Sequence, residues 1–339
     1  MTKRITGSIA ATAAVLAALT ACSTDSADTA DAPSDGPVTI GVVSGSASNP
    51  AVQVMDQGIE DEAEASDVEV YVETSESVDE QIQKADALIA RGVDYLALHP
   101  WDGEAVIPLI ESASSQGVKV IILVDGVPGV VEDGDALTFV SGNEVEAAQA
   151  IGTMVAESAT GPEQAALLTG TPGNLSAENR AKGFTDGIAG SQVEIVAQST
   201  ANWARDEALQ VAGDIITANP DLDVIFAGND EMALGAVAAL QEAGKAGQVD
   251  VIGWNGTCVG LAGLLDGDLL ALAALPFDEF GRTAVQVAVA DSQGEDVDPR
   301  VEPDVPILTA DTARAILDGS AEGSESLKAD LTTAQAGGC

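Results

Sequence analysis

The sequence has few basic residues, few aromatic residues and a single histidine. Only 13 Lys and Arg stand against 55 Asp and Glu, a formal net charge of -42, so the chain lacks the basic surface that binds nucleic acid. It also lacks the Gly-x-Ser-x-Gly, Gly-x-Gly-x-x-Gly and clustered Cys/His patterns of many nucleophilic, dinucleotide-dependent and metal-dependent enzymes. We therefore expect no nucleic-acid partner, no cofactor, no metal and no enzymatic activity.

The chain does contain enough apolar material for a sizeable folded core. Hydrophobic residues make up 46% of the 339 residues and charged residues 20%, which excludes disorder over most of the length. That length allows two domains or one large one. Beyond the N-terminal segment, no apolar run approaches the roughly 18 residues that a spanning helix needs, so we expect no transmembrane helix.

The N-terminal segment carries the features of an exported protein. Lys3 and Arg4 precede a short apolar run over residues 9–19, as in a secretory signal peptide. Residues 19–22, Leu-Thr-Ala-Cys, resemble a bacterial lipobox, which implies cleavage before Cys22 and acylation of that cysteine. We expect a signal peptide over residues 1–21, and then acylated Cys22 and a disordered tether over residues 22–37. An ordinary signal peptide with a chance cysteine is the alternative.

From residue 38 onward, short apolar runs alternate with amphipathic helical patterns. The first series predicts strands at 38–43, 68–72, 95–98, 118–124 and 139–140, with helices at 51–65, 78–89 and 104–116. The second predicts helices at 145–156, 177–188, 206–218, 230–243 and 259–265, with strands at 165–169, 193–197, 224–227, 249–253 and 269–274. Such alternation is typical of parallel sheets covered by helices, and two series predict two α/β lobes.

The residues that follow the predicted strands form the candidate site, because ligands of open parallel sheets bind at the carboxyl ends of strands. All three tryptophans, Trp101, Trp203 and Trp254, fall in these positions, and so does the only histidine, His99. Tryptophan rings offer faces on which sugars stack, and Asp, Asn and Arg side chains can hold hydroxyl groups. The pattern favours a cleft for a hydroxyl-rich small molecule.

Several stretches between residues 38 and 308 resemble the type I periplasmic binding proteins of the ribose-binding kind. The most specific is residues 226–236 (FAGNDEMALGA), and residues 48–50 (SNP), 180–184 (RAKGF), 201–203 (ANW) and 251–257 (VIGWNGT) also match. The resemblance implies two similar Rossmann-like lobes with parallel sheets, joined by a three-strand hinge. The N-terminal lobe would comprise residues 38–141 plus 276–303, and the C-terminal lobe residues 142–275 plus 304–339.

The resemblance also implies a set of ligand contacts, carried over position by position. These contacts are Asn49, Asp125, Trp203, Asn229 and Asn255. Further possible contacts are Ser44, Trp101, Asp102, Glu178, Arg180 and Trp254. Asp230 is expected to cap the helix that begins at Glu231 and to support Asn229.

The chain departs from the pentose-binding pattern within this set. Ala51 and Val52 replace the first-loop aromatics, Glu178 replaces an arginine, and no arginine accompanies Asp125. Two lost guanidinium groups and a gained carboxylate argue against anionic ligands such as sugar acids. Three side chains have two interpretations each: His99 as a cleft donor or a structural residue, Trp254 as a stacking face or core packing, and Glu178 as a ligand contact or solvated surface.

Two cysteines remain beside Cys22. In an oxidising extracytoplasmic compartment a disulfide between Cys258 and Cys339 can persist, and we expect one, with two free thiols as the alternative.

Taken with the resemblance, these features imply an extracytoplasmic monomer that is lipid-anchored to the outer face of the cell membrane. It would capture a neutral sugar or polyol in an interlobe cleft and deliver it to the permease and ATPase of an ABC importer. The alternatives are a cationic or other non-sugar ligand and a role as a signalling receptor subunit. A sugar-responsive repressor of the same fold would need an N-terminal DNA-reading domain where this chain has its export signal.

We expect the substitution Cys22→Ala to prevent anchoring, because the acylated thiol would be lost. Expression in the native host followed by membrane fractionation should find the variant released or unprocessed. A variant that remains membrane-bound and normally cleaved would show that Cys22 is not the anchor.

Overall fold

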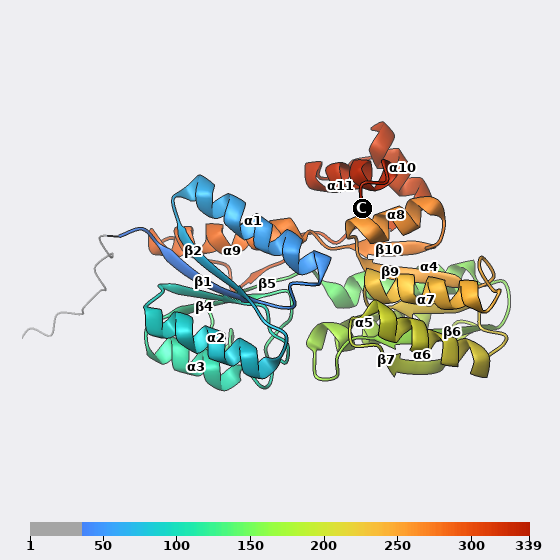
Figure 1. Cartoon of the computed structure of the whole chain (residues 1–339), viewed down its shortest axis with the longest axis horizontal. Coiled ribbons are helices and arrows are strands. Elements are labelled where there is room, and N and C mark those ends of the chain that lie inside the picture. Colours follow the sequence, from blue (N-terminus) through green and yellow to red (C-terminus); the bar gives the residue numbers. More distant parts are fainter. Residues whose placement is uncertain (1–35) are drawn as a thin grey trace, which may run out of the picture. The chain divides into compact units, whose positions relative to one another are not determined.

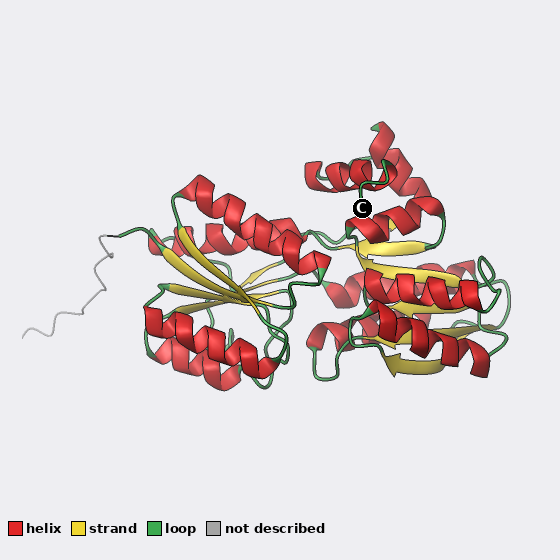
Figure 2. Ribbon diagram, viewed as in Figure 1, coloured by secondary structure: helices red, strands yellow, loops and turns green. Residues whose placement is uncertain are grey.

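The computed structural model describes residues 36–339, which form two six-stranded sheets with helices on their faces (Figures 1 and 2). The predicted signal peptide, Cys22 and nearly all of the tether lie outside the described residues. No helix of residues 36–339 is long and apolar enough to cross a membrane.

The first sheet has the strand order β11-β5-β4-β3-β1-β2, and its strand pairs are parallel. Its strands are β1 (Thr39–Ser44), β2 (Glu69–Thr74), β3 (Tyr95–Leu98), β4 (Lys119–Leu123), β5 (Thr138–Val140) and β11 (Arg300–Val301). Helices α1 (Pro50–Ser66), α2 (Val78–Arg91), α3 (Ile107–Ser115) and α9 (Phe277–Ser292) belong to the same lobe.

The second sheet repeats the pattern with the order β12-β10-β9-β8-β6-β7, and only its edge strand β12 is antiparallel. Its strands are β6 (Glu163–Thr169), β7 (Val193–Thr200), β8 (Val224–Ala227), β9 (Asp250–Asn255), β10 (Ala271–Ala274) and β12 (Ile307–Thr309). The helices are α4 (Glu144–Ser158), α5 (Leu175–Ile188), α6 (Arg205–Ala218), α7 (Asp230–Glu242), α8 (Cys258–Asp266), α10 (Ala310–Asp318) and α11 (Glu325–Gln335).

The chain passes between the two sheets three times, after β5, after β10 and after β11. The prediction of two α/β lobes with parallel sheets is therefore confirmed. The four lobe boundaries that the resemblance implied stay a prediction. The largest difference at a helix start is in α3, which begins at Ile107 rather than at residue 104. Oδ1 of Asp102 accepts hydrogen bonds from the backbone nitrogens of Glu104 and Ala105 and holds a turn there.

Two close helix pairs bring distant segments together. Helix α9 lies beside α1 (Figure 1), and a Cβ on Gly281 would lie 2.2 Å from the carbonyl oxygen of Met55. Helix α5 approaches α4 in the same way, since a Cβ on Gly187 would lie 2.2 Å from the carbonyl oxygen of Gln149. Glycine lets the two backbones of each pair touch, which fixes the helices that flank the chain crossings.

The C-terminal segment is attached to the second lobe by a disulfide. Cys339 bonds to Cys258, the first residue of α8, and helix α11 packs against α8. The sequence pattern predicted no helix after residue 274 and so missed α9, α10 and α11. Helices α10 and α11 bury Ile316 and Leu331 in the apolar cluster of this lobe.

We expect Cys258→Ser to lower the free energy of unfolding by about 4 kcal/mol, because the disulfide closes a loop across a sequence separation of 81 residues. Urea denaturation of oxidised protein measures this loss. Cys339→Ser is the matched control: it should cost the same, and the double variant should cost no more. Two free thiols in protein from an oxidising compartment would contradict the expectation.

Candidate functional site

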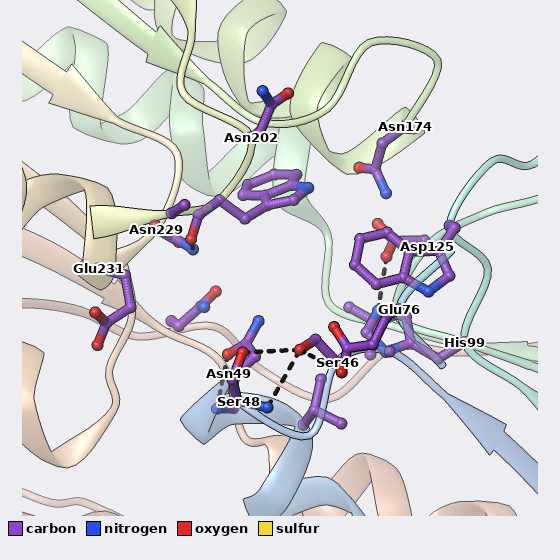
Figure 3. Close-up of a pocket in the computed structure, with 18 of the residues that line it drawn as sticks. Ser46, Ser48, Asn49, Glu76, His99, Asp125, Asn174, Asn202, Asn229 and Glu231 are labelled. Atoms are coloured by element: carbon purple, nitrogen blue, oxygen red, sulfur yellow. Dashed lines mark hydrogen bonds and ion pairs between the residues drawn. The ribbon is translucent and has the colours of Figure 1, made fainter. Parts of the chain in front are cut away.

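A pocket of about 650 Å³ lies at the carboxyl ends of the strands and is lined by residues of both lobes (Figure 3). From the first lobe come residues that follow β1, β2, β3 and β4, with Phe277 of α9. From the second come residues that follow β6, β7 and β8, with Asn255 at the end of β9. The lining residues include Asn49, Glu76, His99, Trp101, Val124, Asp125, Asn174, Arg180, Asn202, Trp203, Arg205, Asp206, Asn229, Glu231, Asn255 and Phe277.

Three of the lining asparagines begin helices. Asn49, Asn174 and Asn229 are the N-caps of α1, α5 and α7, and the side-chain oxygen of each accepts a hydrogen bond from a backbone N–H of its helix at 2.8–3.0 Å. An asparagine oxygen held in this way leaves the amide nitrogen as a donor. The amide of Asn229 also donates to the carbonyl oxygen of Trp203 at 3.0 Å, which ties two parts of the pocket wall together.

Backbone conformations that favour glycine cluster at the pocket. Val124, Asn202, Trp203 and Asn255 have φ angles of 62°, 49°, 64° and 108°, and all four line it. Among the described residues the only other positive-φ position that is not glycine is Asp67. Side chains in this region are strained, and such strain concentrates at binding sites because it directs a side chain that regular structure would point elsewhere.

Trp203 is placed by a close approach to β6. A Cβ on Gly170 would lie 1.9 Å from the indole of Trp203, so only glycine allows the ring to lie against the end of that strand. The ring is partly exposed and lines the pocket. Trp101, on the first lobe, is held by hydrogen bonds from its Nε1 to the hydroxyl of Ser75 at 3.0 Å and to the Ser75 carbonyl at 3.2 Å. Each lobe therefore supplies one anchored indole.

Arg180 is the buried cation of the site. Its Nε donates to Oε1 of Glu144 at 2.8 Å, its Nη2 donates to the same oxygen, and its Nη1 donates to the Gly228 carbonyl at 2.6 Å and to Oδ1 of Asn255 at 3.4 Å. The guanidinium carbon lies 5.3 Å from the ring centroid of Trp203 and 5.0 Å from that of Trp254. Burial raises the pKa of Glu144 above its ordinary value, although the adjacent Arg180 opposes the rise.

A second polar pair lies on the first lobe, where Nε2 of His99 is 2.7 Å from Oδ2 of Asp125 (Figure 3). Burial alone would raise the pKa of Asp125, but the hydrogen bond and charge of His99, together with Arg180, hold it below its ordinary value. Beneath the pair, burial raises the pKa of Asp56 to about 6, and Oδ2 of Asp56 accepts a hydrogen bond from Ser44. His99 is thus both a pocket residue and the partner that orients Asp125.

Asp230 supports the site from behind. Its Oδ2 accepts hydrogen bonds from the backbone nitrogen and the hydroxyl of Thr257, both at 2.8 Å, and this links the start of α7 to the loop that follows Asn255. Its Oδ1 is buried without a hydrogen-bond partner in the described structure, and burial raises the pKa of Asp230 to about 7. The expectation that Asp230 caps α7 is wrong, because the N-cap is Asn229.

The structure brings together most of the residues that the sequence singled out. All five principal residues line the pocket, as do Trp101 and Arg180. Ser44 is buried beneath it, Asp102 holds the turn before α3, and Glu178 is exposed on α5. Trp254 is fully buried in the core and stacks edge-on against Phe226, so its side chain packs rather than lines the pocket.

Sequence reasoning missed Asn174, Glu144 and Phe277. The signal for Asn174 was an asparagine just before a helical pattern, the same signal as at Asn49. Glu144 had no local signal, since its partner Arg180 is 36 residues away. Among residues 36–339, no group of three or more His, Cys, Asp or Glu side chains is arranged to hold a metal ion.

A pocket that is lined by two α/β lobes is typical of two-lobed ligand-binding proteins. Residues 40–296 match the family described as the periplasmic binding protein domain, and the chain belongs to this family. The ribose import binding protein of Salmonella typhimurium is 30% identical over 271 residues, which cover 80% of this chain and 90% of that protein. The resemblance seen in the sequence is confirmed, and membership supports an extracytoplasmic location.

Solved structures agree with this assignment. An ABC transporter solute-binding protein of Actinobacillus succinogenes with bound D-allose has a TM-score of 0.77 and 26% identity, covering 82% of this chain and 99% of that one. The myo-inositol binding protein of Caulobacter, bound to myo-inositol, has a TM-score of 0.77 and 28% identity, covering 83% and 96%. The fold is that of type I periplasmic binding proteins.

We expect Asp230→Asn to change how stability depends on pH. Because the folded pKa of Asp230 lies above its ordinary value, its contribution to stability is fully present below about pH 4 and is lost as pH rises to about 7, by about 4 kcal/mol at most. Asparagine does not titrate, so the variant should gain stability relative to the unaltered protein between pH 4 and pH 8. Urea denaturation across this range, with Asp221→Asn at an exposed position as the control, measures the difference. If the difference in unfolding free energy between Asp230→Asn and the unaltered protein stays constant with pH, the expectation is wrong.

Proposed function

We propose that this protein is an extracytoplasmic solute-binding protein that captures a neutral sugar or polyol between its lobes and delivers it to an ABC importer. The observation that carries the proposal is the pocket itself, in which asparagine amides at three helix N-termini surround a space with an anchored indole from each lobe. Amide groups pair with hydroxyls, and indole faces pack on the C–H faces of a sugar ring. The ligands of the two solved relatives, D-allose and myo-inositol, are molecules of this kind.

The two-walled pocket also suggests how binding is signalled to a transporter. A ligand that contacts Asn49 and Asp125 on one lobe and Trp203, Asn229 and Asn255 on the other interacts fully only when the walls are close together. Differential contact of this kind stabilises a closed arrangement over an open one. The permease of the importer would recognise that arrangement.

The N-terminal segment would attach the protein to the membrane. Acylated Cys22 and the tether to residue 37 would hold the protein at the outer face of the membrane, as the lipobox-like residues 19–22 suggest. The protein would act as a monomer and bind without chemical conversion, in keeping with relatives that are binding proteins.

A cationic ligand is the second candidate. The pocket is lined by four carboxylates, Glu76, Asp125, Asp206 and Glu231, against two guanidinium groups, and Arg205 is already paired with Glu231 at 2.8 Å. An excess of carboxylates attracts amines, and this attraction weakens as salt is added. Because Asp125 is engaged by His99 and the glutamates are partly exposed to solvent, the neutral ligand remains the better match.

Calorimetry of the mature protein should show tight binding to at least one sugar or polyol, and the pocket variants should weaken it. Trp203→Ala should cost about 1–3 kcal/mol of binding free energy, the range for a buried aromatic face and its polar contacts. Asn174→Asp should also weaken binding, because the carboxylate still caps α5 but no longer donates a hydrogen bond. Both variants should fold.

Asn143→Asp is the matched control for Asn174→Asp. Asn143 caps α4 through its side-chain oxygen but does not line the pocket, so the same substitution there should leave affinity unchanged. Titrations with sugars and with amines at two salt concentrations separate the two ligand classes. Salt-sensitive binding of amines, with no response to any sugar or polyol, would replace the proposal by its rival.

A further inference from the structure

The buried pair of Arg180 and Glu144 lies at the boundary between the pocket and the core. Arg180 lines the pocket, whereas Glu144, the first residue of α4, does not. Their side chains are 5% and 4% exposed. All hydrogen bonds that the guanidinium makes in the described structure go to Glu144, Gly228 and Asn255, and they occupy four of its five N–H donors.

The guanidinium is also confined on its faces. The rings of Trp203 and Trp254 lie 5.3 Å and 5.0 Å from its central carbon, close enough for attraction between the cation and each ring. A side chain that is stacked in this way and hydrogen-bonded at its edge has little freedom to turn towards a ligand. Arg180 therefore acts on a ligand mainly through its charge and through the Trp203 ring that it supports.

The effect of that charge depends on Glu144. An arginine does not lose its proton, and a buried cation without a counter-ion is strongly disfavoured. Asp125, the other carboxylate that interacts with the Arg180 charge, is already bonded to His99 on the other lobe. Removing the charge of Glu144 would raise the net charge at the pocket wall by one unit, in a medium where charge is poorly screened.

We propose that Glu144 determines the ligand charge that the pocket accepts, by neutralising Arg180 from behind the pocket wall. With Glu144 in place the pocket accepts neutral hydroxyl-rich molecules and rejects the corresponding sugar acids. Without it, Arg180 becomes a binding site for a carboxylate. Glu144 is a specificity-determining residue that acts through another side chain and does not touch the ligand. The inference rests on the proposed function, because it concerns the sugar that the same pocket would bind.

The experiment compares the affinity for each neutral sugar with the affinity for the corresponding sugar acid. Dissociation constants are measured by calorimetry at pH 7.5 for D-ribose and D-ribonate, D-glucose and D-glucuronate, and D-galactose and D-galacturonate. For the pair whose neutral member binds, Glu144→Gln should raise the affinity for the acid relative to the neutral sugar by about tenfold or more. A loss of packing alone would weaken both members of the pair equally, so the ratio separates a charge effect from a structural one.

Two controls accompany the variant. Glu178→Gln removes a carboxylate from the exposed side of α5, outside the pocket lining, and should leave the ratio within about twofold of the unaltered protein. The double variant Glu144→Gln/Arg180→Gln removes both charges and should return the ratio to that of the unaltered protein. Glu144→Met repeats the measurement without a polar group, in case Glu144→Gln does not fold.

An unchanged ratio in a folded Glu144 variant would overturn the inference, and so would unaltered protein that binds an acid as tightly as its neutral sugar. Those two results leave the proposed function standing, because a neutral sugar still binds. If the unaltered protein binds no sugar or polyol in the wider titrations, the proposed function fails and the inference fails with it.

Discussion

Parallel pairing of the strands is the constraint on which the rest of this structure depends. In a parallel sheet every strand ends at the same edge, and each following helix therefore begins there. Helices α1, α5 and α7 begin in this way at the pocket, so backbone N–H groups that lack helical partners gather where the ligand would lie. The fold itself therefore supplies backbone hydrogen-bond donors to the site, whichever side chains line it.

The N-cap asparagines connect the stability of the helices to the properties of the pocket. One side-chain atom of each asparagine satisfies a backbone N–H, as a serine or aspartate could also do. Only asparagine adds an amide donor and keeps the position uncharged. A single residue type thus meets a folding requirement and a recognition requirement, which explains why asparagine rather than aspartate suits a neutral ligand.

The sequence allowed the fold to be predicted closely, and the site in part. Strands β3 and β8 were predicted residue for residue, because continuous apolar runs such as 95–98 and 224–227 can only be buried strands in this context. Asn49, Asp125, Trp203 and Asn229 follow strands and Asn255 ends one, so their order along the chain placed them near the site, and the resemblance selected them as ligand contacts. Which of two neighbouring side chains faces the pocket could not be inferred. Trp254 and Asn255 are adjacent on β9 and point to opposite faces, and it is Trp254 that is core and Asn255 that lines the pocket.

The three chain crossings bear on how this molecule can be assembled. The first sheet lacks its edge strand until residue 301 is available, and α1 lacks its neighbour α9 until residue 292 is. Neither lobe is therefore complete in any N-terminal fragment shorter than nearly the whole chain. Such long-range pairing slows folding and delays it until synthesis is almost finished. A chain that must pass a membrane unfolded would gain from that delay, since its complete native state cannot form while most of the chain is still being synthesised.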